Sequence, residues 1–377
     1  MGFLFVISVT YLCFYFTKLI VGTMYEIKSS KIFDFSLSLL VVISIVIISI
    51  SIKPDIEYDL SRHYEIVNNM RYYGYEYETG YESLVIIKVI FYLVSLSRYN
   101  ELLPAISVAI TYSIFIYITR NFINKYKTSN KLFLLSWLIN ISILPFLVSY
   151  SGVRTSMAFA IFALALYRDI ILKKKNLTII ILYVIPLFIH PASGILVGLR
   201  ILYFNRNLFV SKLKYLLLFW SFSSYILIDL LESISIPYIS YTAQKLQIYF
   251  LKFDGDHRLY FVNMCFFIFL FILFRWINLG KKADWSENIN KLMEYIELVI
   301  LFAIGSFYIP SITERLLYFI AFFAFPIIYL SVNNSRTRLK LMVIIIFSLF
   351  IVGYITYQYI QVSSHNIYIS FDFLRMN

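Results

Sequence analysis

The chain has 377 residues, of which 60% are hydrophobic, 19% are aromatic and only 14% are charged. This composition is far from that of a soluble domain and predicts an all-α, polytopic integral membrane protein. The formal net charge of +12 would otherwise favour a nucleic-acid partner. However, the lysines and arginines lie in short connectors between apolar segments, where topology and anionic lipid headgroups account for them. We therefore expect the lipid bilayer as a partner and no nucleic acid.

A helix needs about 20 residues to cross roughly 30 Å of hydrocarbon, which predicts about 12 spans in one polytopic domain, 1–377. The predicted spans are 2–22, 34–52, 103–119, 132–149, 154–172, 177–190, 192–205, 215–231, 259–276, 292–309, 316–331 and 339–357. Residues 2–22 lack a basic leading region and a small-residue cleavage site. We interpret them as a retained span.

Basic connectors alternate with connectors that contain the rare reactive side chains. The basic ones contain Lys28, Lys31, Arg120, Lys125, Lys127, Lys131, Lys173, Lys174, Lys175, Arg206, Lys212, Lys214, Arg275, Lys281, Lys282, Arg336, Arg338 and Lys340. By the positive-inside rule these connectors are cytoplasmic. Both termini, a large loop at 53–102 and a second loop at 232–258 are then external.

The apolar stretch 83–97 is predicted to be an interfacial helix on the outer surface. It is short for a crossing, Lys88 lies at its middle, and Arg98 and Glu101 follow it. If it crossed the membrane, the basic connectors on its two sides would fall on opposite faces.

Asp59, Arg62 and His63 open the large external loop, and a helix would place them on one face at positions i, i+3 and i+4. A carboxylate and an imidazole beside a cation suit proton transfer next to an anion. A solvated helix face with a local ion pair would have the same spacing.

Two arginines are predicted at external helix starts, Arg154 after Gly152 and Arg315 after Pro310. A helix N-terminus attracts phosphate, and two guanidiniums can clamp a diphosphate bidentately. Interfacial anchors that reach lipid headgroups are the alternative.

His190 precedes Pro191 and interrupts an apolar run, which predicts a turn at the outer surface that exposes the imidazole. Such a histidine could be a general base or a hydrogen-bond donor to substrate, or only a capping residue. His257 and His365 are weaker candidates.

Several chemical signatures are absent from the sequence. It has no phosphate-binding P-loop, nucleotide fingerprint or HExxH pair, and Cys13 and Cys265 both fall in apolar segments. We expect no metal and no cofactor. An ATP-driven pump and a zinc protease are disfavoured, and the scarcity of charges within spans disfavours an ion-coupled transporter.

The order and spacing of five short motifs resemble the EpsG-like, Wzy-type polysaccharide polymerases. The motifs are Asp59-x-x-Arg62-His63-Tyr64, Glu78-Thr79-Gly80-Tyr81, Gly152-Val153-Arg154, His190 between two spans, and Glu314-Arg315-Leu316. Family members often have Glu-Pro-Gly and Asp-Tyr where this chain has Glu78-Thr79-Gly80 and Asp59-Leu60.

The resemblance implies a multi-pass protein of the bacterial cytoplasmic (inner) membrane with the architecture of metal-independent, GT-C-like glycosyltransferases. Such an enzyme joins repeat units of a capsular polysaccharide or exopolysaccharide, each carried on undecaprenyl diphosphate. A flippase and a chain-length regulator of the same pathway would be partners.

In such a reaction positive charge would stabilise the leaving diphosphate, and a base would accept a hydroxyl proton. Arg154 and Arg315, with Arg62, are the candidates for the first role; Asp59, His63 or His190 are the candidates for the second. Glu78 and Tyr81 are candidates for glycan binding. A lipid-linked-oligosaccharide flippase, a membrane acyltransferase that modifies glycans, and a structural partner of a secretion complex are the alternatives.

Overall fold

The computed structural model describes residues 31–54, 59–126, 146–204, 287–306 and 310–323, together with single positions between 217 and 272 and position 326. Every regular element in these ranges is helical, so the all-α prediction is confirmed for the described part of the chain. These helices belong to two compact units, and the boundary between the units falls within α4 (Val85–Ser95) and within α8 (Val153–Leu166).

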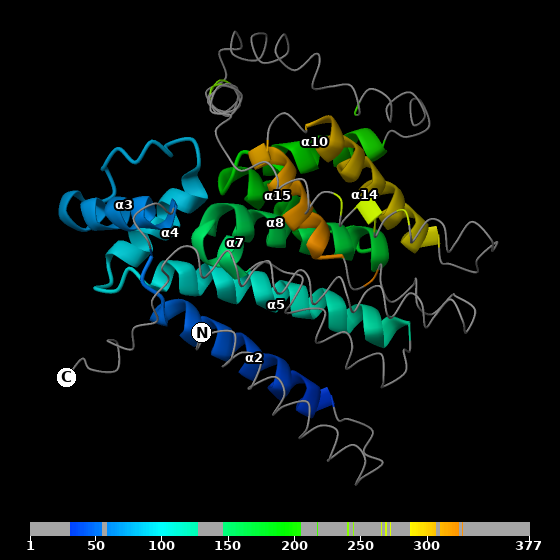
Figure 1. The fold of residues 1–377 in the computed structure, drawn as a ribbon, viewed down its shortest axis with the longest axis horizontal. Helices are drawn as coiled ribbons and strands as arrows, with labels where there is room; N and C mark the ends of the chain where they lie inside the picture. Colours follow the sequence, from blue (N-terminus) through cyan, green and yellow to red (C-terminus); the bar gives the residue numbers. More distant parts are fainter. Residues whose placement is uncertain are drawn as a thin grey trace. The chain divides into compact units, whose positions relative to one another are not determined.

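The first unit is built around α5 (Leu102–Lys125), and α2 (Lys31–Ser51) lies along it (Figure 1). Two shorter helices, α3 (Asp59–Tyr73) and α7 (Phe146–Ser151), complete its described part. Ser107 on α5 donates a hydrogen bond to the Ser149 carbonyl oxygen at 2.7 Å, and its hydroxyl lies 2.7 Å from that of Ser156. These buried hydroxyl contacts fix α7 and the start of α8 against α5.

The second unit contains most of α8 and the elements that follow it. These are the π-helix η1 (Tyr167–Ile171), α9 (Leu177–Val184), the 3-10 helix η2 (Ile185–Phe188), α10 (Ser193–Phe204), α14 (Glu287–Gly305) and α15 (Pro310–Ala321).

Aromatic rings form the core of the second unit. Phe162 on α8 lies edge-on to Phe319 on α15, with 5.6 Å between ring centroids, and Phe162 also contacts Tyr295 on α14. The Tyr295 hydroxyl donates to the Leu196 carbonyl oxygen of α10 at 2.7 Å, which satisfies the one polar group of this ring in the core. Large rings and one shared hydrogen bond therefore hold four helices together.

A partly buried ion pair lies beside this aromatic core, where the sequence indicated few charges within spans. Nη2 of Arg200 on α10 lies 2.5 Å from a carboxylate oxygen of Asp169 on η1, and both side chains are 16% exposed. The Tyr183 hydroxyl donates to the same carboxylate oxygen at 2.9 Å. The attraction between the two charges and the hydrogen bond from Tyr183 thus compensate the free-energy cost of removing both charges from water.

Most of the predicted spans that fall within the described residues coincide with helices. α2 and α5 match 34–52 and 103–119, α8 with η1 matches 154–172, and α9 with η2 matches 177–190. The described residues contain one helix, Leu102–Lys125, that is long and apolar enough by itself to cross a membrane, beside several shorter apolar helices. The segment expected to be interfacial is the 11-residue helix α4.

The helix starts after residue 280 differ from the prediction. α14 begins at Glu287 and not near 292, and α15 begins at Pro310 and not near 316. Proline suits the first turn of a helix, where its missing N–H is not needed. Spans 2–22 and 339–357, most of 132–149, His257 and His365 lie outside the described residues, as do 215–231, 232–258 and 259–276 apart from single positions.

Candidate functional site

The helix that opens the predicted external loop, α3, buries one stripe of side chains. Leu60, His63, Val67 and Met70 recur at helical spacing and are buried, whereas the Arg62 side chain is 74% exposed. Asp59 is in the first turn, where its negative charge interacts favourably with the helix dipole, and it pairs with Arg62. The helix and the local ion pair are confirmed.

The expectation that His63 shares one solvated face with Asp59 and Arg62 is wrong. Successive residues on a helix point about 100° apart. When Arg62 faces water beside Asp59, His63 turns with Leu60 and Val67 into the unit. The imidazole is 2% exposed, and its ring centroid lies 5.2 Å from that of Phe91.

Burial and a nearby guanidinium control the protonation of His63. Burial lowers its pKa to about 3, the charge of Arg154 and the weaker effect of Arg62 act in the same direction, and the Asp59 carboxylate opposes them. The imidazole is therefore neutral near pH 7. Because the charge on Arg154 is felt at His63, the first unit brings these two candidate residues into one electrostatic environment.

The chain reaches Arg154 through a break between α7 and α8. The Gly152 N–H donates to the Val148 carbonyl oxygen at 3.0 Å, and a Cβ at position 152 would lie 2.9 Å from that oxygen. Only glycine allows this approach without displacing backbone. The break places Arg154, which is half-buried, in the first turn of α8, with the buried residues Thr155 and Ser156 next to it.

Tyr64 is part of the first motif, which suggested no role for it, and it follows His63 on α3. Its hydroxyl is buried and has no hydrogen-bond partner among the described residues. Burial raises its pKa, and the neighbouring Tyr150 and Glu101 raise it further, so the phenol stays protonated at any physiological pH. We refer to Asp59, Arg62, His63, Tyr64 and Arg154 as the α3–α8 cluster. It offers a cation, a neutral imidazole and a hydroxyl donor.

His190 belongs to the second unit, and the prediction that it is exposed is wrong. The turn is present, since η2 ends at Phe188 and α10 begins at Ser193, but the imidazole is only 4% exposed. Its Nδ1 accepts a hydrogen bond from the Ala192 N–H at 3.1 Å, and the Ser193 hydroxyl donates to the His190 carbonyl oxygen at 2.6 Å. The turn thus folds the ring back against its own backbone. An accepting Nδ1 requires that the proton of a neutral ring be on Nε2.

Arg315 also belongs to the second unit. Because α15 begins at Pro310, Arg315 lies in the second turn of this helix and not at its start, as had been predicted. It is half-buried. The Thr313 hydroxyl bonds with the Ala303 and Ser306 carbonyl oxygens at 3.2 and 3.1 Å, which fixes this end of α15 against the end of α14.

The tight turn before α4 contains Glu78 and Tyr81. Glu78 is exposed and Tyr81 is half-buried, while Gly80 has a φ of +73°, which favours glycine. Partial burial raises the pKa of Glu82, but hydrogen bonds from the Thr79 and Gly80 N–H groups outweigh it and hold this pKa below its usual value. Glu82 is therefore the ionised carboxylate that organises the turn.

The structure brings Asp59, Arg62, His63 and Arg154 together within the first unit. The other predicted site residues, Glu78, Tyr81, His190 and Arg315, are in the second unit. Among the described residues, no group of three or more His, Cys, Asp or Glu side chains is placed to hold a metal ion.

Folding stability should fall as the pH drops below about 6.5, because of His63. Its folded-state pKa is near 3 and its unfolded value is near 6.5, so between these values the unfolded chain binds a proton that the folded chain does not. We expect the purified protein to unfold at a lower temperature at pH 5.0 than at pH 7.5, and His63→Gln to reduce this difference. An unchanged pH dependence in His63→Gln would show that other groups cause it.

Comparison with known proteins identifies the chain. The model of the EpsG family matches residues 36–371, which include every predicted site residue. No curated protein and no solved structure matches the chain. The match spans nearly the whole sequence and both units, and it confirms the resemblance seen in the motifs: the chain belongs to the EpsG family.

Proposed function

We propose that this membrane protein is a polysaccharide polymerase that joins undecaprenyl-diphosphate-linked oligosaccharide repeat units at the outer face of the bacterial cytoplasmic membrane. Membership of the EpsG family supports a polymerase of polysaccharide biosynthesis. The observation that carries the site assignment is the α3–α8 cluster, where half-buried Arg154 lies close enough to buried His63 to lower its pKa.

The proposed reaction is a glycosyl transfer. A hydroxyl oxygen of the incoming repeat unit attacks the anomeric carbon of the growing glycan and forms the new glycosidic bond. The bond from that carbon to the lipid diphosphate breaks, the diphosphate leaves with the electron pair, and the hydroxyl proton passes to a base. The site must therefore stabilise a growing negative charge on the diphosphate and accept one proton.

Arg154 suits the first requirement. A guanidinium offers several N–H donors in a planar fork that matches phosphate oxygens, and the first turn of α8 adds backbone N–H groups directed at the same anion. Partial burial strengthens the attraction because little water competes for the charge. Exposed Arg62, paired with Asp59, would assist from the surface of α3.

His63 suits the second requirement only when substrate is bound. With a pKa of about 3 it is a weak proton acceptor in the empty site. A diphosphate bound at Arg154 would offset the guanidinium charge that helps to lower this pKa and would add negative charge nearby, so the imidazole would become more basic. The base would thus be strengthened by the substrate. Asp59 is the alternative acceptor on the same helix.

In the second unit, His190 is proposed as a catalytic residue and Arg315 as a diphosphate-binding residue. Because His190 Nδ1 accepts a backbone N–H, substrate would interact with Nε2. Glu78 and Tyr81 are proposed to contact the glycan. The reaction is proposed to need no metal, and a flippase and a chain-length regulator are the proposed pathway partners.

The function is tested with purified protein in liposomes that contain lipid-linked single repeat units. We expect a ladder of longer glycans on a gel and release of undecaprenyl diphosphate, neither of which should occur in liposomes without protein. Movement of the lipid-linked unit across the bilayer without a ladder would identify a flippase. Transfer of an acyl group to the glycan without chain growth would identify an acyltransferase.

A further inference from the structure

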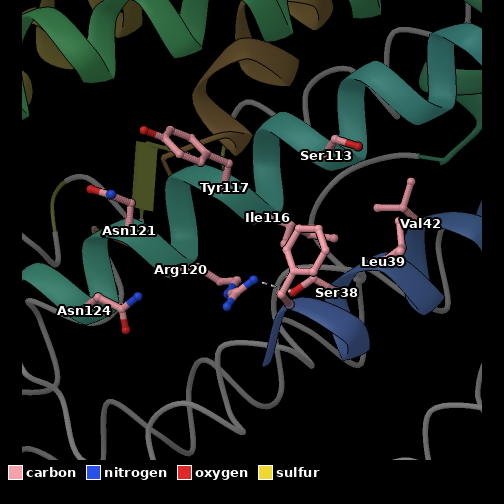
Figure 2. A pocket seen from close by; sticks show the side chains of 10 residues that line it. Ser38, Leu39, Val42, Ser113, Ile116, Tyr117, Arg120, Asn121 and Asn124 are labelled. Atoms are coloured by element: carbon pink, nitrogen blue, oxygen red, sulfur yellow. Dashed lines mark hydrogen bonds between the residues drawn. The ribbon is translucent and has the colours of Figure 1, made fainter. Parts of the chain in front are cut away.

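A groove lies between α2 and α5 in the first unit (Figure 2). None of the described residues that line it belongs to the α3–α8 cluster. Its volume is about 300 Å³, which is at the lower end for small-molecule sites. Apolar side chains, among them Leu39, Val42 and Ile116, line part of it. Ser38, Arg120 and Asn124 supply polar groups.

Among the described residues that line the groove, Arg120 is the only charged one. Figure 2 shows its side chain reaching from α5 toward α2, where Nη1 donates a hydrogen bond to the Ser38 hydroxyl at 3.2 Å. A guanidinium has five N–H donors, and this hydroxyl uses one of them. Asn121, the next residue of α5, and Asn124, one helical turn after Arg120, also line this groove and carry amide groups. The described part of the lining therefore provides one positive charge and several hydrogen-bond donors beside an apolar wall.

The groove lies at the basic ends of its two helices. Lys31 begins α2, and Arg120 precedes Lys125 at the end of α5. The positive-inside rule places these ends at the cytoplasmic face. Arg120 follows Leu102, at the other end of α5, by 18 residues, or about 27 Å of helix. The groove is therefore separated from the external site by most of the membrane thickness.

Apolar surface continues from the groove along α2. Phe35 and Leu39 line the groove and are 61% and 48% exposed, and Leu40, Ile43 and Ile47 are also exposed on this helix. Such a surface favours contact with acyl chains. A ligand that satisfies both parts of the groove has a phosphate next to Arg120 and hydrocarbon along α2.

We propose that the α2–α5 groove binds an anionic phospholipid of the cytoplasmic leaflet, with its phosphate at Arg120 and its acyl chains along α2. Basic pockets between membrane helices on the cytoplasmic side are suited to anionic headgroups. A free phosphate would share the polar contacts but would leave the apolar wall unused. The groove is thus a lipid site independent of the proposed polymerase reaction.

The test measures lipid retention by the full-length protein. Protein is exchanged into nanodiscs of phosphatidylcholine with a minor fraction of phosphatidylglycerol, released into mild detergent, and analysed by native mass spectrometry. We expect wild-type protein to retain phosphatidylglycerol preferentially and Arg120→Gln to lower this retention about tenfold, the effect of losing one charge-assisted contact. Lys125→Gln is the matched control, since this lysine is exposed at the same helix end and does not line the groove.

A second variant keeps the charge of Arg120 and fills the apolar part of the groove. Val42→Trp should also lower phosphatidylglycerol retention, because the larger ring occupies the space for the acyl chain. The proposal is overturned if both Arg120→Gln and Val42→Trp retain the lipid as the wild type does, or if Lys125→Gln loses as much as Arg120→Gln. Displacement of the lipid by millimolar glycerol phosphate would identify a site for free phosphate and would also overturn it.

Discussion

Replacing Arg154 with alanine is expected to lower the rate of polymer formation about 100-fold or more, the usual cost of removing one donor from a preorganised anion site. Arg154 is half-buried in the first turn of α8, and its charge reaches buried His63. The measurement is conversion of lipid-linked single repeats into polymer by purified protein in liposomes, at matched protein amounts. Arg154→Lys is the sharper variant because it keeps the charge and loses the bidentate fork, so we expect it to be intermediate.

Arg98→Ala is the matched control for Arg154→Ala. Arg98 belongs to the same predicted external region, but it is exposed and lies outside the α3–α8 cluster. Its removal should leave the rate near that of the wild type, as expected for a surface charge. Near-normal polymerisation by Arg154→Ala would refute the assignment of the diphosphate to this residue. A loss of similar size in Arg98→Ala would indicate a general effect of external positive charge.

Replacing Asp169 with asparagine should destabilise the protein by about 1.5–3 kcal/mol, because partly buried Arg200 would keep its charge and lose its charged hydrogen-bond acceptor. The bonds from Arg200 Nε and Nη2 to the carboxylate, at 3.2 and 2.5 Å, would lose their charged acceptor. The measurement is the free energy or midpoint of unfolding in detergent. A double variant, Asp169→Leu with Arg200→Met, should recover much of the loss, since it leaves neither charge unpaired.

Glu287→Gln is the control for the ion pair. Glu287 pairs with Lys291 one turn along α14, but its side chain is 69% exposed. Surface pairs of this kind contribute about 0–1 kcal/mol, so this variant should unfold close to the wild type. Equal stability of Asp169→Asn and Glu287→Gln would mean that the Asp169–Arg200 pair does not hold the second unit together.

The length of apolar runs predicted most helices of the described region, because a span needs a run of apolar residues that is visible in the sequence. It predicted the starts of α14 and α15 less well. α14 begins with Glu287, before its apolar run, and α15 begins at Pro310, a capping feature that a hydropathy window does not weigh.

The candidate site was predictable only in part. The motif spacing indicated that Asp59, Arg62, His63 and Arg154 matter, and the structure places all four in one unit. The Asp169–Arg200 pair was missed and the burial of the Tyr64 hydroxyl was not foreseen, since no local pattern marks a polar group that residues far along the chain cover. Exposure of His190 was wrongly expected, because a turn signal does not show which way its side chain faces.

The sequence by itself determined that this is a membrane protein of the EpsG family and that the part of the chain described by the structure is helical, because composition, apolar run length and motif order are properties of the chain alone. Tertiary structure decided the chemical state of the candidate residues. His63 and Arg62 are neighbours in the sequence, yet one is buried with a pKa near 3 and the other is exposed to water. Burial lowers the pKa of His63, and so does the charge of Arg154, which is 91 positions away in the sequence. Both effects depend on packing between distant segments.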